Sequence, residues 1–286
     1  MTTGTKTTRI KEIARLRAQV KQWRIAGESI AFVPTMGNLH AGHLQLVSAA
    51  KAQADRVIVS IFVNPTQFGE SEDFSSYPRT LDADIEKLES LAVDIAFVPI
   101  NEEIYPTRAM TEVSISQIAD NYCGAARPGH FNGVATVVSK LFNIVQPDYA
   151  FFGEKDFQQL AVIRVMVADL NTPVEIISVP TFREADGLAM SSRNGRLTEQ
   201  QRKQAVKLYQ SLSLAKQAVL AKQCAYTEIE RQFIQLLTAQ GFKPDYFSIC
   251  RRHDLQAATL DDKHIIILLA ARLGKTRLID NIQLDI

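Results

Sequence analysis

The 286-residue sequence predicts an α/β protein, in which a parallel sheet flanked by helices is followed by a smaller α+β domain. Two observations predict this fold class. Short runs of β-branched and aromatic residues alternate with helical patterns up to about Pro180. Beyond that point, two helical patterns precede three consecutive strand patterns. We therefore expect one domain over residues 1–181 and a second, smaller domain over residues 182–286.

The strands expected in the first domain lie at residues 29–34, 56–63, 94–98, 149–152 and 174–179. The helical patterns lie at residues 10–26, 44–54, 81–92, 134–145 and 157–170. Strands that alternate with helices in this way form a parallel sheet covered on both faces. Ligands bind such sheets beyond the carboxyl ends of the strands. The residues that follow each strand are therefore the first candidates for a functional site.

The second domain is expected to start with a long helix that reaches about Ala221. Thr198 and Gln201 have the spacing of a capping box at its beginning. A second helix is expected at residues 227–239. The last strands are expected at residues 245–251, 264–271 and 276–281. Helices followed by consecutive strands predict an antiparallel sheet in this domain.

Composition excludes several classes of protein. The formal net charge is +1, so no overall field attracts the chain to nucleic acid or to anionic lipid. The most apolar run, residues 265–271, is too short to span a bilayer and suits a buried strand. The N-terminus lacks the apolar segment of a secretory signal, and the three cysteines are far apart, as expected of reduced structural cysteines. We expect a soluble cytoplasmic protein.

Residues 32–43 carry the strongest motif. An apolar strand runs into a turn that contains Gly37, and His40 and His43 stand just before a helical pattern. The N-terminus of a helix favours anions, because its unpaired N–H groups and its dipole converge there. Gly42 lets the backbone approach a phosphate closely. The motif predicts a phosphate-handling site for a nucleotide, against the alternatives of two ordinary surface histidines or a zinc site that lacks further ligands at metal spacing.

Other residues that follow strands would lie at the same edge of the sheet and add further hydrogen-bond donors. Gln67 and Gln159 are neutral amides that could bind a hydroxy acid. Lys155 could place a positive charge on a phosphate, although a solvated loop lysine is the alternative. Ser191, Ser192 and Arg193 could form a triphosphate clamp or an ordinary polar loop.

Two acidic residues open the helix that follows Thr80. Asp82 and Asp84 either interact with the helix dipole or hold Mg²⁺ through water near the phosphates.

One motif elsewhere is misleading. Gly274 and Lys275 resemble the end of a phosphate-binding P-loop, but Leu269 occupies the position of its first glycine and a strand pattern follows.

Six blocks of the sequence together resemble one known family. They are residues 33–43, 61–68, 77–80, 127–134, 152–159 and 186–194. In this order they are similar to the pantothenate synthetases, and the likeness extends to residues 278–281. The resemblance implies a Rossmann-like fold and a dimer formed through the N-terminal domain. It also implies an ATP- and Mg²⁺-dependent ligase that joins (R)-pantoate to β-alanine through pantoyl-adenylate, releasing AMP and pyrophosphate.

The resemblance also assigns roles to residues. The loop expected to wrap the ATP phosphates consists of Met36, Gly37, Asn38, Leu39, His40, Ala41, Gly42 and His43. The other nucleotide contacts are expected from Gly153, Glu154, Lys155, Asp156, Phe182, Met190, Ser191, Ser192 and Arg193. His43, His40, Lys155 and Arg193 are the expected catalytic residues. Gln67 would bind pantoate and later β-alanine, Gln159 would bind pantoate, and Asp84 would lie near Mg²⁺. Phe182 and Ala83 depart from the residues usual in the family.

The two half-reactions need different help. The pantoate carboxylate is ionised at neutral pH and needs no base, whereas the amine of β-alanine must lose a proton, either to His43 or to the phosphate of the adenylate.

Three rival functions share part of the motif. They are a nucleotidyltransferase that stops after moving a nucleotide, an aminoacyl-tRNA synthetase, and a nucleotide sensor without catalysis. An aminoacyl-tRNA synthetase would need a basic surface to bind tRNA, and neither the net charge nor any Lys/Arg-rich stretch of this sequence provides one. A nucleotide sensor would leave Gln67 and Gln159 without a role.

Overall fold

A computed structural model describes residues 6–286 except 70–71, 73 and 107–109. The chain divides into two compact units. The first consists of Met1–Ser116, Arg127–Glu154 and Val162–Pro180, and the second of Gln117–Ala126, Lys155–Ala161 and Thr181–Ile286. Two short segments that precede Thr181 thus belong to the second unit. The division into functional domains at residue 181 stays a prediction.

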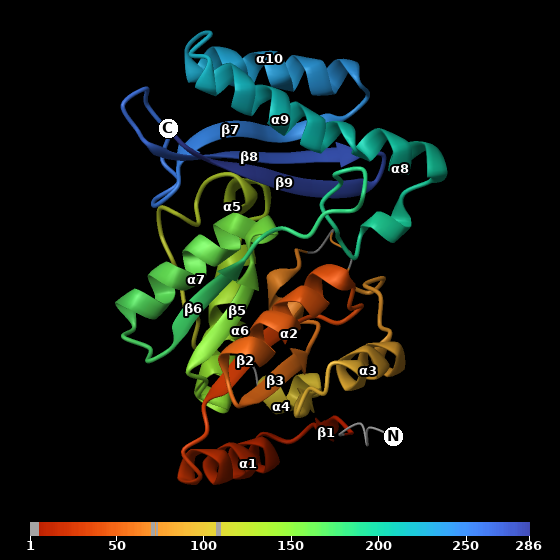
Figure 1. Ribbon diagram of the computed structural model, residues 1–286, viewed down its shortest axis with the longest axis vertical. Coiled ribbons are helices and arrows are strands. Elements are labelled where there is room, and N and C mark those ends of the chain that lie inside the picture. Colours follow the sequence, from red (N-terminus) through yellow and green to blue (C-terminus); the bar gives the residue numbers. More distant parts are fainter. Residues whose placement is uncertain (1–5, 70–71, 73, 107–109) are drawn as a thin grey trace. The chain divides into compact units, whose positions relative to one another are not determined.

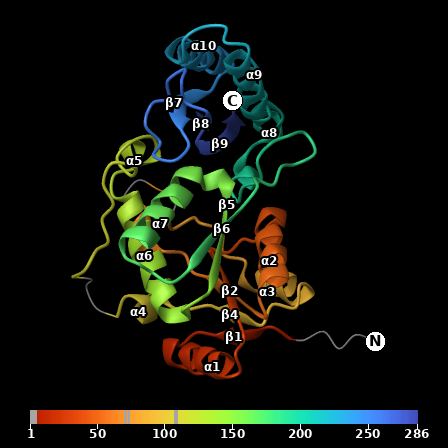
Figure 2. The ribbon, with the colours of Figure 1, turned by 60° about the vertical axis from the view of Figure 1, so that its left-hand side comes forward.

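The first unit is built on a six-stranded parallel sheet in the order β1-β4-β3-β2-β5-β6 (Figures 1 and 2). Its strands are β1 (Thr8–Ile10), β2 (Ile30–Thr35), β3 (Arg56–Ile61), β4 (Ile95–Phe97), β5 (Tyr149–Gly153) and β6 (Glu175–Val179). The chain moves outward from β2 to β3 and β4, and then returns to the other side of β2 as β5. The carboxyl ends of β2 and β5 therefore flank the point where the strand order reverses, which is where open α/β sheets bind ligands.

Helices cover both faces of this sheet (Figures 1 and 2). The helices of this part of the chain are α1 (Ile13–Ile25), α2 (Ala41–Gln53), α3 (Leu81–Ser90), α4 (Asn101–Ile104), α6 (His130–Val145) and α7 (Phe157–Asp169). Ala31 and Val33 of β2 share a buried cluster with residues of α2 and α3. Phe32, between them, points to the opposite face and meets Phe142 of α6 edge-on. Because successive side chains of β2 are buried on opposite faces of the sheet, the strand is apolar along its whole length.

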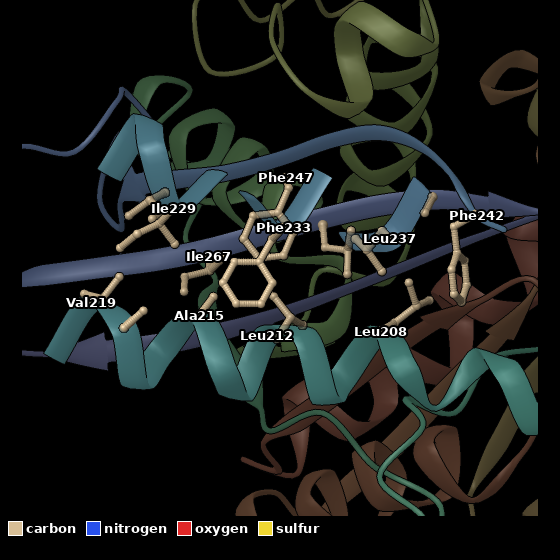
Figure 3. Close-up of a cluster of buried hydrophobic side chains, with 14 of the residues drawn as sticks. Leu208, Leu212, Ala215, Val219, Ile229, Phe233, Leu237, Phe242, Phe247 and Ile267 are labelled. Carbon is tan, nitrogen blue, oxygen red and sulfur yellow. The ribbon is translucent and has the colours of Figure 1, made fainter. Parts of the chain in front are cut away.

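The second unit contains an antiparallel sheet, in the order β7-β8-β9, and a pair of long helices. Its elements are α5 (Cys123–Ala126), α8 (Glu199–Ala205), α9 (Lys207–Leu220), α10 (Tyr226–Ala239), β7 (Lys243–Arg251), β8 (His264–Leu273) and β9 (Thr276–Asp285). Leu208, Leu212 and Ala215 recur at helical spacing along one face of α9 and are buried (Figure 3). Phe233 of α10 stacks on Phe247 of β7, with ring centroids 5.2 Å apart.

The expected elements are present, but several of their bounds differ; for example, the helix expected at residues 44–54 begins at Ala41 and the strand expected at residues 276–281 runs to Asp285. Ile10 is not helical but belongs to β1, which pairs with β4, so α1 begins only at Ile13. The helix expected to reach Ala221 is interrupted at Val206 into α8 and α9. The helix expected at residues 134–145 begins earlier, at His130.

The capping box is confirmed, and so is the exclusion of a P-loop. The Thr198 hydroxyl accepts the N–H of Gln201, and the Gln201 side chain accepts the N–H of Thr198. Gly274 and Lys275 form the turn between β8 and β9, so they are not part of a P-loop. Gly274 has a φ of +59°, a conformation that favours glycine. Every helix in the described ranges is too short or too polar to cross a lipid bilayer.

Candidate functional site

The turn between β2 and α2 has an unusual backbone. Gly37 and Asn38 both have positive φ values, +80° and +50°, so the chain reverses sharply after the strand. A Cβ atom on Gly37 would lie 3.0 Å from Cγ2 of Ile61 and 3.1 Å from Oδ2 of Asp84. Glycine is therefore required by φ and by space. The turn delivers His40 to the N-cap position of α2.

Helix α3 holds this turn from the side. Asp84, which is fully buried, accepts the N–H of Asn38 at 2.8 Å and the N–H of Leu39 at 2.7 Å, one on each carboxylate oxygen. The Thr80 hydroxyl also donates to Asp84 at 3.2 Å. Lys87, one turn further along α3, donates to the carbonyl oxygen of Leu39 at 2.7 Å. Both the donors and an acceptor of the turn are thus fixed by a single helix.

His40 and His43 lie together on the first turn of α2. Their ring centroids are 4.0 Å apart. The backbone N–H of His40 donates to Nδ1 of His43 at 3.3 Å. Because Nδ1 accepts this bond, the proton of the neutral His43 ring is on Nε2. His43 can therefore offer an N–H donor at the positive end of a 13-residue helix, where an anion is favoured.

Gln67 is fixed by its neighbours in a similar way. It ends the short 3₁₀ helix η1 (Pro65–Gln67), which follows β3. Oε1 of Gln67 accepts from Nδ2 of Asn64 at 3.1 Å, and Nε2 lies 3.3 Å from the sulfur of Met36. The orientation of the Asn64 amide is itself determined, because its nitrogen donates to the Gly133 carbonyl and its oxygen accepts from the Tyr105 hydroxyl. The donor end of the Gln67 amide therefore faces the histidine-bearing turn.

A cavity of about 290 Å³ lies beside the same turn. Met36 and Gly37 form one wall, and apolar residues at the ends of β3 and β4, including Ile61, Phe62 and Val98, form another. The first unit thus combines anion donors, an amide and an apolar space at the carboxyl edge of its sheet.

The cationic residues expected to clamp the nucleotide belong to the second unit, whereas Gly153 and Glu154 belong to the first. Lys155 lies in η2 (Glu154–Asp156), and Asn281 of β9 donates to its carbonyl at 3.0 Å. Gln159 lies on the first turn of α7. Phe182 and Met190 are joined by a backbone hydrogen bond of 2.9 Å, and Ser191 accepts the N–H of Arg193 at 3.2 Å.

A buried ion pair anchors this segment to β9. Arg183 makes two hydrogen bonds to Asp280, of 2.7 and 2.9 Å, and its guanidinium stacks on Tyr209. Burial raises the pKa of Asp280, although Arg183 acts in the opposite direction. Residues 181–190 are thereby fixed to the strand that also holds Lys155. A single site that joins these residues to His43 stays a prediction.

Asp82 and Asp84, the acidic residues expected near a magnesium ion, are both engaged in contacts within the protein. Both oxygens of Asp84 are occupied by backbone N–H groups, and Asp82 is exposed and pairs with Arg9. The part of the chain that the structure describes holds no group of three His, Cys, Asp or Glu side chains placed to bind one metal ion. Asp84 serves here as the anchor of the turn.

Sequence reasoning missed several residues that shape the site. Lys87 and Asn64 act through hydrogen bonds to segments distant in sequence, and Thr80 donates to Asp84 within the first turn of α3. Asn64 could have been found, because it directly follows the strand expected at residues 56–63 and precedes Pro65, a typical N-cap position. Nothing local distinguishes Lys87 from other surface lysines.

The fold and the site define a class: nucleotide-binding α/β enzymes with a paired-histidine turn after the central strand. A family model described as "Pantoate-beta-alanine ligase" matches residues 8–283. The chain is 53% identical to the pantothenate synthetase of Pseudomonas fluorescens strain SBW25, over 97% of this chain and 99% of that protein. It is 52% identical to that of Alteromonas mediterranea, over 96% and 98%.

Solved structures agree. The pantothenate synthetase of Thermus thermophilus superposes with a TM-score of 0.90 at 44% identity, covering 96% of this chain and 99% of that one. The Francisella tularensis enzyme, described as complexed with β-γ ATP and β-alanine, gives 0.83 at 36% identity and covers 96% and 97%. The chain belongs to the pantoate–β-alanine ligase family, and it is a ligase of pantoate and β-alanine. The expected fold class is confirmed.

Proposed function

We propose that the chain makes pantothenate in two half-reactions, with pantoyl-adenylate as the intermediate. The paired histidines at the start of α2 carry the proposal, because they form an anion site at the switch point of the sheet. In the first half-reaction the pantoate carboxylate attacks the α-phosphorus of ATP. A C–O–P bond forms, the bond to the β-phosphate breaks, and pyrophosphate leaves. In the second, the β-alanine amine displaces AMP from the acyl carbon.

The first half-reaction needs positioning and charge stabilisation. Nε2–H of His43 would donate to the phosphates as negative charge moves to pyrophosphate, and His40, Lys155 and Arg193 would add to this stabilisation. Met36–His43, Gly153–Asp156, Phe182 and Met190–Arg193 form the proposed ATP site. Mg²⁺ belongs to the proposal as the counter-ion of ATP, and Asp84 anchors the turn that would bind the phosphates.

Gln67 and Gln159 are proposed to bind pantoate. The donor end of the Gln67 amide suits a carboxylate or hydroxyl oxygen, and the neighbouring apolar cavity suits the branched, methyl-bearing carbon of this acid. β-Alanine would follow into contact with Gln67. Its ammonium proton goes either to His43 or to the phosphate of the adenylate.

The proposal has three further parts. The chain is expected to form a homodimer through its first unit, as its family resemblance implies. It is expected to act in the cytoplasm, where ATP is available, and without nucleic acid or membrane as a partner. The near-zero net charge supports the last point.

The direct test incubates the protein with Mg-ATP, pantoate and β-alanine, omits each in turn, and identifies the products by mass. We expect pantothenate and AMP only when all are present, and pantoate-dependent exchange of pyrophosphate into ATP without β-alanine. AMP transfer that ignores β-alanine would instead indicate a nucleotidyltransferase. Formation of pantothenate without any exchange would contradict the adenylate route.

Replacing Gly133 tests how tightly Gln67 is held. A Cβ atom there would clash with the carbonyl oxygen of Thr66 and lie 2.7 Å from the nitrogen of Gln67. We expect Gly133→Ala to destabilise the protein by about 1–3 kcal/mol, although alanine is normally the better helix former. The pantoate KM should rise about tenfold, because η1 must move. Denaturant unfolding and initial rates measure both effects, and Asn143→Ala, exposed on the same helix, should change neither.

A further inference from the structure

A largely buried cluster of polar side chains surrounds the backbone carbonyl of Gln67. His130, the first residue of α6, contacts this oxygen through Nδ1 at 2.8 Å, and Arg127 donates to it at 3.3 Å. Arg127 also meets Nε2 of His130 at 2.8 Å. Its other N–H groups make two hydrogen bonds to Glu72, of 2.5 and 2.6 Å. The proposed role of Gln67 does not account for these contacts.

The contacts determine the protonation state of His130. A carbonyl oxygen only accepts hydrogen bonds, so Nδ1 must carry a proton. A guanidinium only donates, so Nε2 must present a lone pair to Arg127. The ring is therefore neutral and in its Nδ1–H form. A second proton, on Nε2, would place two donors against each other.

The surrounding charges favour the same state. The guanidinium of Arg127 is in contact with the ring, and His130 stands at the positive end of a 16-residue helix. Only 8% of His130 is exposed. Glu72, beyond Arg127, acts in the opposite direction. Burial would raise the pKa of Glu72, but the hydrogen bond and charge of Arg127 outweigh it and hold that pKa below its usual value.

We propose that His130, supported by Arg127 and Glu72, is a positioning residue that holds Gln67 for pantoate only while its imidazole is neutral. Protonation of Nε2 repels Arg127, so His130 and Arg127 can no longer hold the carbonyl of Gln67 together. The side chain of Gln67 then loses its alignment between Asn64 and Met36. Pantoate binding therefore weakens as the pH falls. This inference rests on the proposed role of Gln67 in the first half-reaction.

The test measures pantoate-dependent exchange of pyrophosphate into ATP between about pH 5 and pH 9. In the wild type, kcat/KM for pantoate should fall about tenfold per pH unit below one inflection. His130→Asn keeps a donor near the position of Nδ1 but cannot gain a proton. We expect its pantoate KM to rise several-fold and this acid limb to disappear, with the ATP KM within twofold of wild type. His253→Asn, an exposed histidine of the second unit, should keep the wild-type profile.

A second variant keeps the proposal testable if His130→Asn folds poorly. Arg127→Gln removes the charge that opposes protonation of His130 and leaves Glu72 beside it. The acid limb should therefore move to higher pH by about one unit, an effect that a merely structural loss would not produce. An unchanged limb in His130→Asn, or a limb that moves to lower pH in Arg127→Gln, would overturn the proposal.

Two other outcomes are informative. Variants that change only the β-alanine KM, and leave the exchange reaction intact, would show that the cluster contacts β-alanine directly and would also overturn the proposal. If the wild type shows no exchange at all, the adenylate route fails instead. The pH dependence of the pantoate KM is then measured on pantothenate formation, where the same limb is expected.

Discussion

Replacing His43 by alanine should lower pantoate-dependent pyrophosphate exchange by more than about 100-fold. In the proposed mechanism the imidazole would contribute one donor, Nε2–H, to charge that develops on the phosphates, and loss of one such donor commonly costs about 3 kcal/mol of transition-state stabilisation. The fold should survive, since His43 is partly exposed and the turn before it is held by Asp84. Isotope exchange measures the step, and circular dichroism measures the fold.

Two conservative variants separate the functions of the two nitrogens of His43. Asparagine places an acceptor near the position of Nδ1 and so keeps the bond from the N–H of His40, but it has no group at Nε2. Glutamine reaches the position of Nε2 with a donor. We expect His43→Gln to recover part of the exchange rate and His43→Asn to resemble alanine. If His43→Asn were instead more active than His43→Gln, the effect of His43 would come from its hydrogen bond within the turn. Exchange at the wild-type rate in His43→Ala would remove this residue from the mechanism.

The residues around His43 also show why part of the site could be predicted from sequence. The apolar strand, Gly37 and the histidine pair are local features, and each has a direct structural consequence. Alternating strands and helices then place this segment at the edge of a parallel sheet. The capping box at Thr198 and the absence of a P-loop at Gly274 were predictable for the same reason.

Features that depend on distant partners could not be predicted. β1 is three residues long and becomes a strand only by pairing with β4, which lies far along the chain at Ile95–Phe97. The break at Val206 has no glycine or proline to signal it. Asp84 occupies the first turn of a helix, where an acidic residue is ordinary. It accepts hydrogen bonds from two backbone N–H groups only because α3 packs beside the turn that follows β2.

Replacing Asp84 by asparagine should lower kcat/KM for ATP in the exchange reaction on the order of 100-fold. The substitution preserves shape but puts an NH₂ group against the N–H of Asn38 or Leu39, so a charged hydrogen bond worth about 1.5–3 kcal/mol becomes a clash of donors. The turn then loses the geometry that presents His40 and His43. The ATP KM should account for most of the loss, and Asp82→Asn, an exposed neighbour, should behave as wild type.

Magnesium dependence distinguishes this anchoring role from the metal-binding role expected from the sequence. If Asp84 anchors the turn, the magnesium concentration that half-saturates exchange should stay within about twofold of wild type at saturating ATP. Loss of a metal ligand would instead raise that concentration and allow excess magnesium to restore the rate. Lys87→Met provides an independent check, because it releases the Leu39 carbonyl from the same helix without touching a carboxylate. It should raise the ATP KM in the same direction, whereas a role of α3 confined to metal binding predicts no effect.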